Sequence, residues 1–198
     1  MIESFREARR VLDAFLGDEA LLRRCAAVGE LLHRRFCDGR KVLACGNGGS
    51  ACDAAHFAEE LTGRFRAPPP GCEDRAPLPA LACTDTGHIT CTANDYGFDA
   101  VFERWVRALG QSGDVLVLLS TSGNSENIVR AARAGRERGM TTVALLGRGG
   151  GRLAGVCDHE IIVPGETSDR IQELHMLILH AWVEDVERRL REGDRVCG

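Results

Sequence analysis

The sequence predicts an α/β protein in which a parallel β-sheet is flanked by helices on both faces. Short apolar runs alternate with helical stretches along most of the chain, as in strand–helix–strand units. The clearest strand, 114–119, contains the run Val-Leu-Val-Leu-Leu, which is apolar on both faces like a central parallel strand. Such sheets bind ligands where the carboxyl ends of the strands meet helix starts, so we expect a functional site there.

Size, composition and charge are those of an ordinary globular protein. A chain of 198 residues suits one compact domain, and its 44% hydrophobic and 27% charged content argues for neither disorder nor a membrane span. The net charge of −4 predicts no broad attraction to nucleic acid. The nine cysteines are odd in number and form no CxxC pair, and no signal-peptide pattern precedes the first helix. We expect reduced thiols in the cytoplasm, with Cys52 in a packing role.

Two amphipathic helices are predicted before the first strand. An apolar stripe runs from Ile2 to Leu16 and stops at Gly17, and Asp18 can cap a second helix that closes at Gly39. These helices have no sheet position to fill. We expect the pair within residues 1–39 to pack onto the domain and into a subunit interface.

A glycine-rich turn follows the first predicted strand. The strand covers 42–45, and the next thirteen residues after the turn predict a helix capped by Ser50 or Asn47 that stops at Gly63. Gly48 and Gly49 let the backbone approach a ligand closely. Unpaired N–H groups and the helix dipole both face this loop, so it is a candidate anion site.

The remaining elements repeat the alternation of strands and helices. The stretch 67–79 is rich in proline and is predicted to be an exposed loop. Further strands and helices are expected at 80–83, 98–109, 141–146, 161–163 and 168–191.

A second polar loop follows the strand at 114–119. Ser120, Thr121, Ser122 and Ser125 offer hydroxyls and backbone N–H groups at a helix start, with no cation. This suits a phosphate on a small molecule better than a nucleoside triphosphate, for which the P-loop lysine is missing. The alternative is a serine-rich turn that only caps a helix.

A metal site is possible behind the glycine loop. His56 and Glu60 are four residues apart and share one helix face, although such pairs are commonly just exposed polar residues and no HExxH motif is present. Gln172 and His180 could complete a site for Zn²⁺ or a similar divalent ion. These two lie about 12 Å apart along one helix, so both reach one ion only by leaning together or from different subunits. His175 is expected to pack in the core.

Five stretches and one histidine resemble a known family. The matching residues are Cys45–Ser50, His56–Arg64, Asn94–Phe98, Ser120–Ser125, Asp169–Glu173 and His180. Over nearly the whole chain, and in the right order, the sequence resembles the phosphoheptose isomerases, which are sedoheptulose 7-phosphate isomerases of the sugar isomerase (SIS) domain family. It departs from them in a longer loop at 67–79 and a shorter one at 163–168.

The resemblance implies a single SIS domain over 1–198, with a flavodoxin-like three-layer core at 40–198 and a long C-terminal helix. It implies a homotetramer with active sites at subunit interfaces, and one zinc ion per subunit. The implied ligands are His56, Glu60, Gln172 and His180. The implied phosphate-binding residues are Ser120, Thr121, Ser122 and Ser125. The other implied substrate-binding residues are Asn47, Gly48, Gly49, Ser50, Glu60, Asn94, Asp95, Asp169 and Gln172.

The implied reaction moves a carbonyl between C1 and C2 of sedoheptulose 7-phosphate through a cis-enediol. The product, D-glycero-D-manno-heptose 7-phosphate, would feed nucleotide-activated heptose for lipopolysaccharide, a capsule or another glycan. Glu60 fits the base and His180 the partner acid. A carboxylate bound to metal is a poorer base, so Glu60 would do one job at a time. The alternatives are a non-catalytic binding protein of the replication-initiator-associating type, or another sugar-phosphate isomerase.

Overall fold

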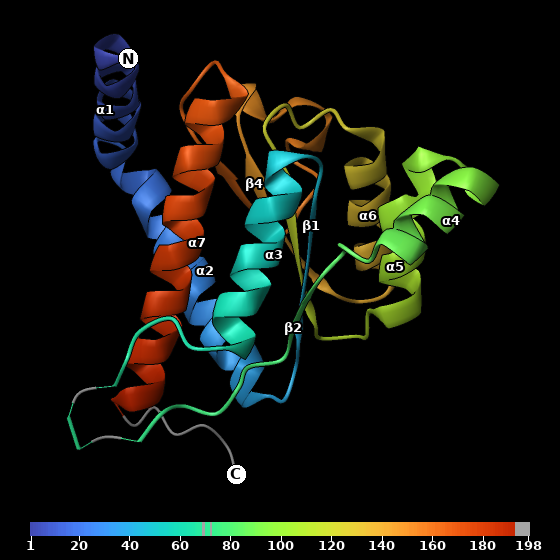
Figure 1. Cartoon of the computed structure of the whole chain (residues 1–198), viewed down its shortest axis with the longest axis horizontal. Helices are drawn as coiled ribbons and strands as arrows, with labels where there is room; N and C mark the ends of the chain where they lie inside the picture. Colours follow the sequence, from blue (N-terminus) through green and yellow to red (C-terminus); the bar gives the residue numbers. More distant parts are fainter. Residues whose placement is uncertain (69, 72, 193–198) are drawn as a thin grey trace.

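A computed structural model describes residues 1–68, 70–71 and 73–192 of the chain, and these form a three-layer α/β sandwich (Figure 1). In chain order the α-helices are α1 (Ile2–Leu16), α2 (Glu19–Cys37), α3 (Gly49–Thr62), α4 (Thr86–Tyr96), α5 (Val101–Leu109), α6 (Glu126–Glu137) and α7 (Ser168–Arg191). The strands are β1 (Val42–Gly46), β2 (Ala80–Ala82), β3 (Val115–Ser120), β4 (Thr141–Leu146) and β5 (His159–Ile162). The predicted fold class is confirmed.

The strands form one sheet in the order β2-β1-β3-β4-β5, and every neighbouring pair is parallel. This is the flavodoxin-like order, in which the direction of winding reverses between β1 and β3. Gly46 at the end of β1 is in register with Leu119 near the end of β3. The glycine loop and the serine-rich loop therefore lie side by side at the switch point, where such folds bind ligands.

Alternate strand residues face two separate apolar cores. Val42 and Ala44 pack with α2, α3 and α7 on one side of the sheet, and Leu43 and Cys45 pack with α5 and α6 on the other (Figure 1). Both faces of β3 are fully buried, which explains why its sequence is continuously apolar.

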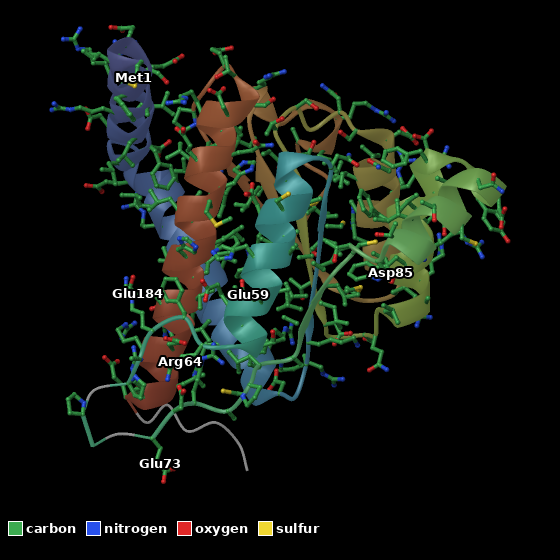
Figure 2. All side chains as sticks on the ribbon, in the orientation of Figure 1. Met1, Glu59, Arg64, Glu73, Asp85 and Glu184 are labelled. Carbon is green, nitrogen blue, oxygen red and sulfur yellow. The ribbon has the colours of Figure 1, made fainter. Side chains whose placement is uncertain are left out.

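The two N-terminal helices form as predicted, but the rest of the chain buries α2 more completely than α1. Asp18 caps α2 by accepting a hydrogen bond from the N–H of Leu21 at 2.9 Å. α2 packs on α7, whereas α1 stands at the edge of the molecule and contacts α2 and α7 along one side only (Figure 2). Ile2, Phe5 and Leu16 of α1 remain 66%, 71% and 53% exposed. The apolar stripe of α1 is thus only partly covered in the single chain, since Phe15 is buried and Val11 and Leu12 pack against the core.

The start of α3 differs from the prediction. Gly48 occupies the N-cap position with φ 56° and ψ −122°, and no side chain caps the helix. This conformation is easily accessible only to glycine, so the N-cap residue is Gly48 and neither Ser50 nor Asn47. The predicted side-chain cap was wrong, whereas the predicted end of the helix at Gly63 is confirmed.

The proline-rich loop is anchored more firmly than expected. Its described residues form no helix and no strand, as predicted, but Leu78 is buried and the Arg75 side chain is almost fully covered. The Arg75 guanidinium donates to the backbone carbonyl of Glu60 at 2.7 Å and to the carboxylate of Glu187 at 2.8 Å. Pro69 and Cys72 lie outside the described residues.

Cys45 and Cys83 are buried, as expected of small apolar side chains, and no disulfide joins the cysteines that the structure describes. The packing role predicted for Cys52 was wrong, because Cys52 lies on the exposed side of α3. Within the described part of the chain, no helix is both long enough and apolar enough to cross a bilayer.

Candidate active site

A pocket of about 290 Å³ opens at the carboxyl ends of β1 and β3. It is lined mostly by small polar groups and glycines, namely Asn47, Gly48, Gly49, Ser50, Leu119, Ser120, Thr121, Ser125, Ser168 and Gln172. α3, α6 and α7 all begin beside it, so unpaired backbone N–H groups and the positive ends of helix dipoles are directed toward it. This is the arrangement that binds phosphate groups.

The glycine loop is held in place by an amide pair. Asn47 and Asn127, at the start of α6, donate to each other's side-chain oxygens at 2.9 Å in both directions. The contact takes one N–H and the oxygen of each amide, and it joins the two loops at the switch point. Gly49 lets the Gln172 side chain pack closely, since a Cβ there would lie 2.7 Å from Oε1 of Gln172. The close approach to a ligand predicted for Gly48 and Gly49 stays a prediction.

The serine-rich loop presents two kinds of hydroxyl. Ser120 is buried, and its Oγ accepts from the N–H of Gly123 at 3.1 Å, which shapes the turn. Ser125 is the N-cap residue of α6, yet its side chain makes no capping hydrogen bond. The Oγ1 of Thr121 lies 3.1 Å from the Oγ of Ser168 at the start of α7. Thr121, Ser125 and Ser168 can therefore donate to an anion in the pocket.

A second cluster lies further along the same pair of helices. His56 and Glu60 on α3 face His180 on α7. The Nε2 atom of His56 lies 3.1 Å from Nε2 of His180 and 3.4 Å from Oε1 of Glu60. One ligand atom from each of the three residues can be chosen so that all lie within 4.8 Å of one another.

The spacing and chemistry of this cluster fit a divalent metal ion. Ligand atoms at 2.0–2.1 Å from a tetrahedral zinc ion are separated by about 3.3 Å, close to the two distances measured around His56. Two imidazoles and a carboxylate with an open position also form a common donor set of catalytic zinc sites. We conclude that His56, Glu60 and His180 could hold such an ion.

Neighbouring groups orient these three side chains. Nδ1 of His56 lies 3.1 Å from Oε2 of Glu59, which directs the other ring nitrogen toward His180. The Phe65 ring packs beside the His180 ring at a centroid distance of 5.3 Å. The hydrogen bond from Arg75 to the Glu60 carbonyl fixes the backbone at Glu60.

Asp53 lies between the two clusters on α3. Positions 49, 53, 56 and 60 share one helix face by periodicity, and Gly49 and His56 on that face contact Gln172 and His180 of α7. One Asp53 carboxylate oxygen, Oδ2, is buried without a hydrogen-bond partner. Burial raises the pKa of Asp53 to about 6, and the nearby His56 only partly offsets this.

Several residues predicted to contact substrate lie outside the pocket of the single chain. Ser122 accepts from the N–H of Asn124, Asn94 donates to its neighbour Asp95 on the exposed end of α4, and Asp169 is exposed beside Arg170. Gln172 lines the pocket, with Nε2 3.3 Å from the Oγ of Ser50. The roles of these residues stay predictions.

Sequence reasoning missed three side chains at the site, namely Ser168, Asn127 and Asp53. The first two come from helix starts opposite the loops that bind them, 47 and 80 residues away in the chain. Only the fold brings these partners together. Asp53 had a local signal, because it lies one helical turn before His56 on the same face.

The fold is that of a sugar isomerase domain. The chain belongs to the SIS domain family, whose model matches residues 5–147. Within that family it belongs with the phosphoheptose isomerases. It is 48% identical to the phosphoheptose isomerase of Fusobacterium nucleatum over 188 residues, which cover 95% of this chain and 94% of that protein.

Solved structures agree with this assignment. The phosphoheptose isomerase of Neisseria gonorrhoeae superposes with a TM-score of 0.86 at 41% identity, over 94% of this chain and 96% of that one. A phosphoheptose isomerase from Francisella tularensis superposes with a TM-score of 0.87 at 34% identity, over 94% and 95% of the two chains.

Proposed function

We propose that this chain is the aldose–ketose isomerase that converts sedoheptulose 7-phosphate to D-glycero-D-manno-heptose 7-phosphate, the first step toward nucleotide-activated heptose. One observation carries the proposal: a hydroxyl-lined anion pocket and a cluster of two imidazoles and a carboxylate lie on the same α3–α7 helix pair. Gln172 and His180 mark the two sites and are about 12 Å apart along α7. An extended sugar phosphate can contact both sites at once.

The phosphate binds at the switch point. Hydroxyls of Thr121, Ser125 and Ser168 and the N–H groups of the helix starts donate to its oxygens. This fixed end orients the sugar chain, so that C1 and C2 lie beside Glu60 and His180. Holding reactants in place in this way contributes to the rate independently of acid–base chemistry.

Isomerisation requires one proton to leave C2 of the aldose or C1 of the ketose and another to return to the neighbouring carbon. Glu60 takes the proton as base, and His180 moves a proton to or from the oxygen atoms, with a cis-enediol between the two steps. A zinc ion held by His56, Glu60 and His180 would supply electrostatic stabilisation of the negative charge that develops on these oxygens.

The active assembly is a homotetramer with its sites at subunit interfaces, in the cytoplasm. Two features support an assembly. Ile2, Phe5 and Leu16 leave an apolar surface open on α1. The separation of about 12 Å between Gln172 and His180 along α7 would be bridged if one of the two came from another subunit. Asn94, Asp95 and Asp169 likewise reach a substrate across such an interface.

A non-catalytic binding protein is the weaker alternative. A chain that only binds another protein has no need for Glu60 or His180, whereas this one has both, and both face His56. Another sugar-phosphate isomerase would share the chemistry and differ only in the length of the sugar accepted.

The direct test is incubation of purified protein with sedoheptulose 7-phosphate, with and without a chelator, followed by detection of heptose 7-phosphate by NMR. We expect conversion that stops on chelation and returns with Zn²⁺. No conversion by the metal-loaded protein would contradict the proposal, and conversion of a shorter ketose phosphate alone would assign a different isomerase.

A further inference from the structure

None of the described residues that line the anion pocket has a positively charged side chain. All residues that line it are neutral, although a phosphate monoester carries nearly two negative charges at neutral pH. Neutral donors bind phosphate through hydrogen bonds, but they leave its net charge uncompensated. This raises the question of which cation lies nearest to the pocket.

Arg148 reaches the pocket through one hydroxyl. It lies two residues after the end of β4, and its guanidinium Nη2 donates to the Oγ of Ser168 at 3.2 Å. The same Ser168 oxygen lies 3.1 Å from Oγ1 of Thr121, and both residues line the pocket. A phosphate oxygen bound to Ser168 would therefore lie no more than about 6 Å from the guanidinium.

Among the residues that the structure describes, no carboxylate pairs with the charge of Arg148. Its two hydrogen-bond partners are neutral, namely the Ser168 hydroxyl and the backbone carbonyl of Glu166, at 2.8 Å from Nε. Among the described residues, no carboxylate oxygen lies within 4.0 Å of its guanidinium nitrogens, whereas the nearby Arg152 is paired with Glu126. Arg148 is also exposed, so an incoming anion can approach it.

The backbone at Arg148 adds a second, independent observation. With φ 48°, Arg148 is the one described residue other than glycine in the left-handed region. Such a conformation is unfavourable for a side chain as large as arginine and often marks a functional position. The preceding Gly147 packs so tightly that a Cβ there would lie 2.8 Å from the Thr121 carbonyl. The backbone at residue 148 therefore begins beside the serine-rich loop.

We propose that Arg148 is a phosphate-recognition residue. Its guanidinium lies beside Ser168 and neutralises the charge of the phosphate that Ser168 binds. This inference rests on the proposed function, because the phosphate is that of the substrate. The bond to Glu166 keeps the side chain over the pocket rim instead of free in solvent. The strained backbone is retained because a glycine at this position would have no charge to offer.

The test compares wild type with Arg148→Gln, Arg148→Lys and Arg148→Gly. Arg138→Gln is the matched control, because Arg138 is exposed, donates among the described residues only to the Gly110 carbonyl, and lies before β4 whereas Arg148 lies after it. KM and kcat are measured with sedoheptulose 7-phosphate, and the dissociation constant of inorganic phosphate is measured by calorimetry at two salt concentrations.

We expect Arg148→Gln to raise KM and the phosphate dissociation constant about tenfold, with kcat within twofold. Arg148→Lys should retain most of the affinity, and Arg138→Gln should match wild type. Phosphate binding by wild type should weaken with salt more steeply than binding by Arg148→Gln. Arg148→Gly should lose the same affinity without a lower melting temperature, because it relieves the backbone strain.

Two results would overturn the inference. Equal KM and phosphate affinity in Arg148→Gln and Arg138→Gln would show that the charge does not act on the ligand. Equal losses in the Lys and Gln variants, together with lower melting temperatures, would show that Arg148 only ties down the loop before α7. If wild type fails to isomerise the sugar, the proposed function is wrong, and the calorimetry alone decides the role of Arg148: tighter phosphate binding by wild type supports it, and equal or absent binding contradicts it.

Discussion

The two ends of the α3–α7 helix pair differ in the groups that they offer to a ligand and in the charge of the ion that each can bind. At the switch point, where α3 and α7 begin, the protein offers hydroxyls, amides and backbone N–H groups that belong to neutral residues. About two to three turns further along these helices, it offers two imidazoles and a carboxylate that can hold a metal ion. Helix starts bind anions without any charged side chain, whereas metal ligation and proton transfer need titratable groups.

The difference should separate binding from turnover. Substitutions at the metal end should act mainly on kcat or metal content, and substitutions at the switch point should act mainly on KM. The following variants test this division, beginning with the largest expected effect.

Replacing Glu60 or His180 by glutamine should lower kcat by about 10²–10⁴-fold, because each variant loses a proton-transferring group. Binding of inorganic phosphate at the other end should persist, as calorimetry can show. The matched control is Glu137→Gln, which removes an exposed carboxylate on α6 that pairs with Arg107. Near-normal turnover in either the Glu60 or the His180 variant would contradict the assignment.

Glu59→Gln should weaken zinc binding about 10-fold to 100-fold, because its carboxylate holds the ring of His56 at 3.1 Å without joining the ligand cluster. A competition assay against a zinc-binding dye measures this. Glu59 and Glu73 are both labelled in Figure 2, and Glu73→Gln serves as the control, since it removes the same charge from the exposed proline-rich loop. Equal zinc affinity in the two variants would show that Glu59 does not orient His56.

Gly49→Ala should raise KM about tenfold and leave kcat within a few-fold, since its Cβ would displace the Gln172 amide from the pocket. Gly48→Ala provides the contrast. No atom lies within 4 Å of a Cβ at Gly48, but φ 56° makes any side chain strained there. It should lower the melting temperature more than Gly49→Ala does. Steady-state kinetics and thermal unfolding of both variants would show whether the pocket wall or the turn is damaged.

The sequence predicted most of the fold and only part of the site, for physical reasons. Strands such as 114–119 are recognisable because burial on both faces demands a continuous apolar run. The contact between Thr121 and Ser168 was not predictable, because two hydroxyl residues in separate loops carry no sign of their proximity. The Gly48 cap was missed because cap preferences describe side chains, whereas this turn selects for backbone conformation.

The two histidines of α7 illustrate the same limit. His175 and His180 look alike in sequence, yet His175 is fully buried with Nε2 3.2 Å from the Leu146 carbonyl, while His180 faces His56. The expectation that His175 packs in the core is confirmed. The apolar stripe of α7 predicts that His175 lies inside the protein. The effect of His175 on stability depends on how completely its ring is buried.

That effect gives the smallest of the expected changes. Burial lowers the pKa of His175 from 6.5 to about 4, so the folded protein keeps this ring neutral where the unfolded chain protonates it. Since the unfolded state binds more protons between these values, stability is highest above pH 6.5 and falls as the pH drops toward 4. The free energy of unfolding should be lower by about 1 kcal/mol at pH 5.5 than at pH 7 from this residue alone. In His175→Gln, which can still donate to Leu146, urea unfolding at the two pH values should show a difference smaller by this amount. An unchanged difference would mean that His175 binds protons equally in the folded and unfolded protein, and that its burial does not lower its pKa.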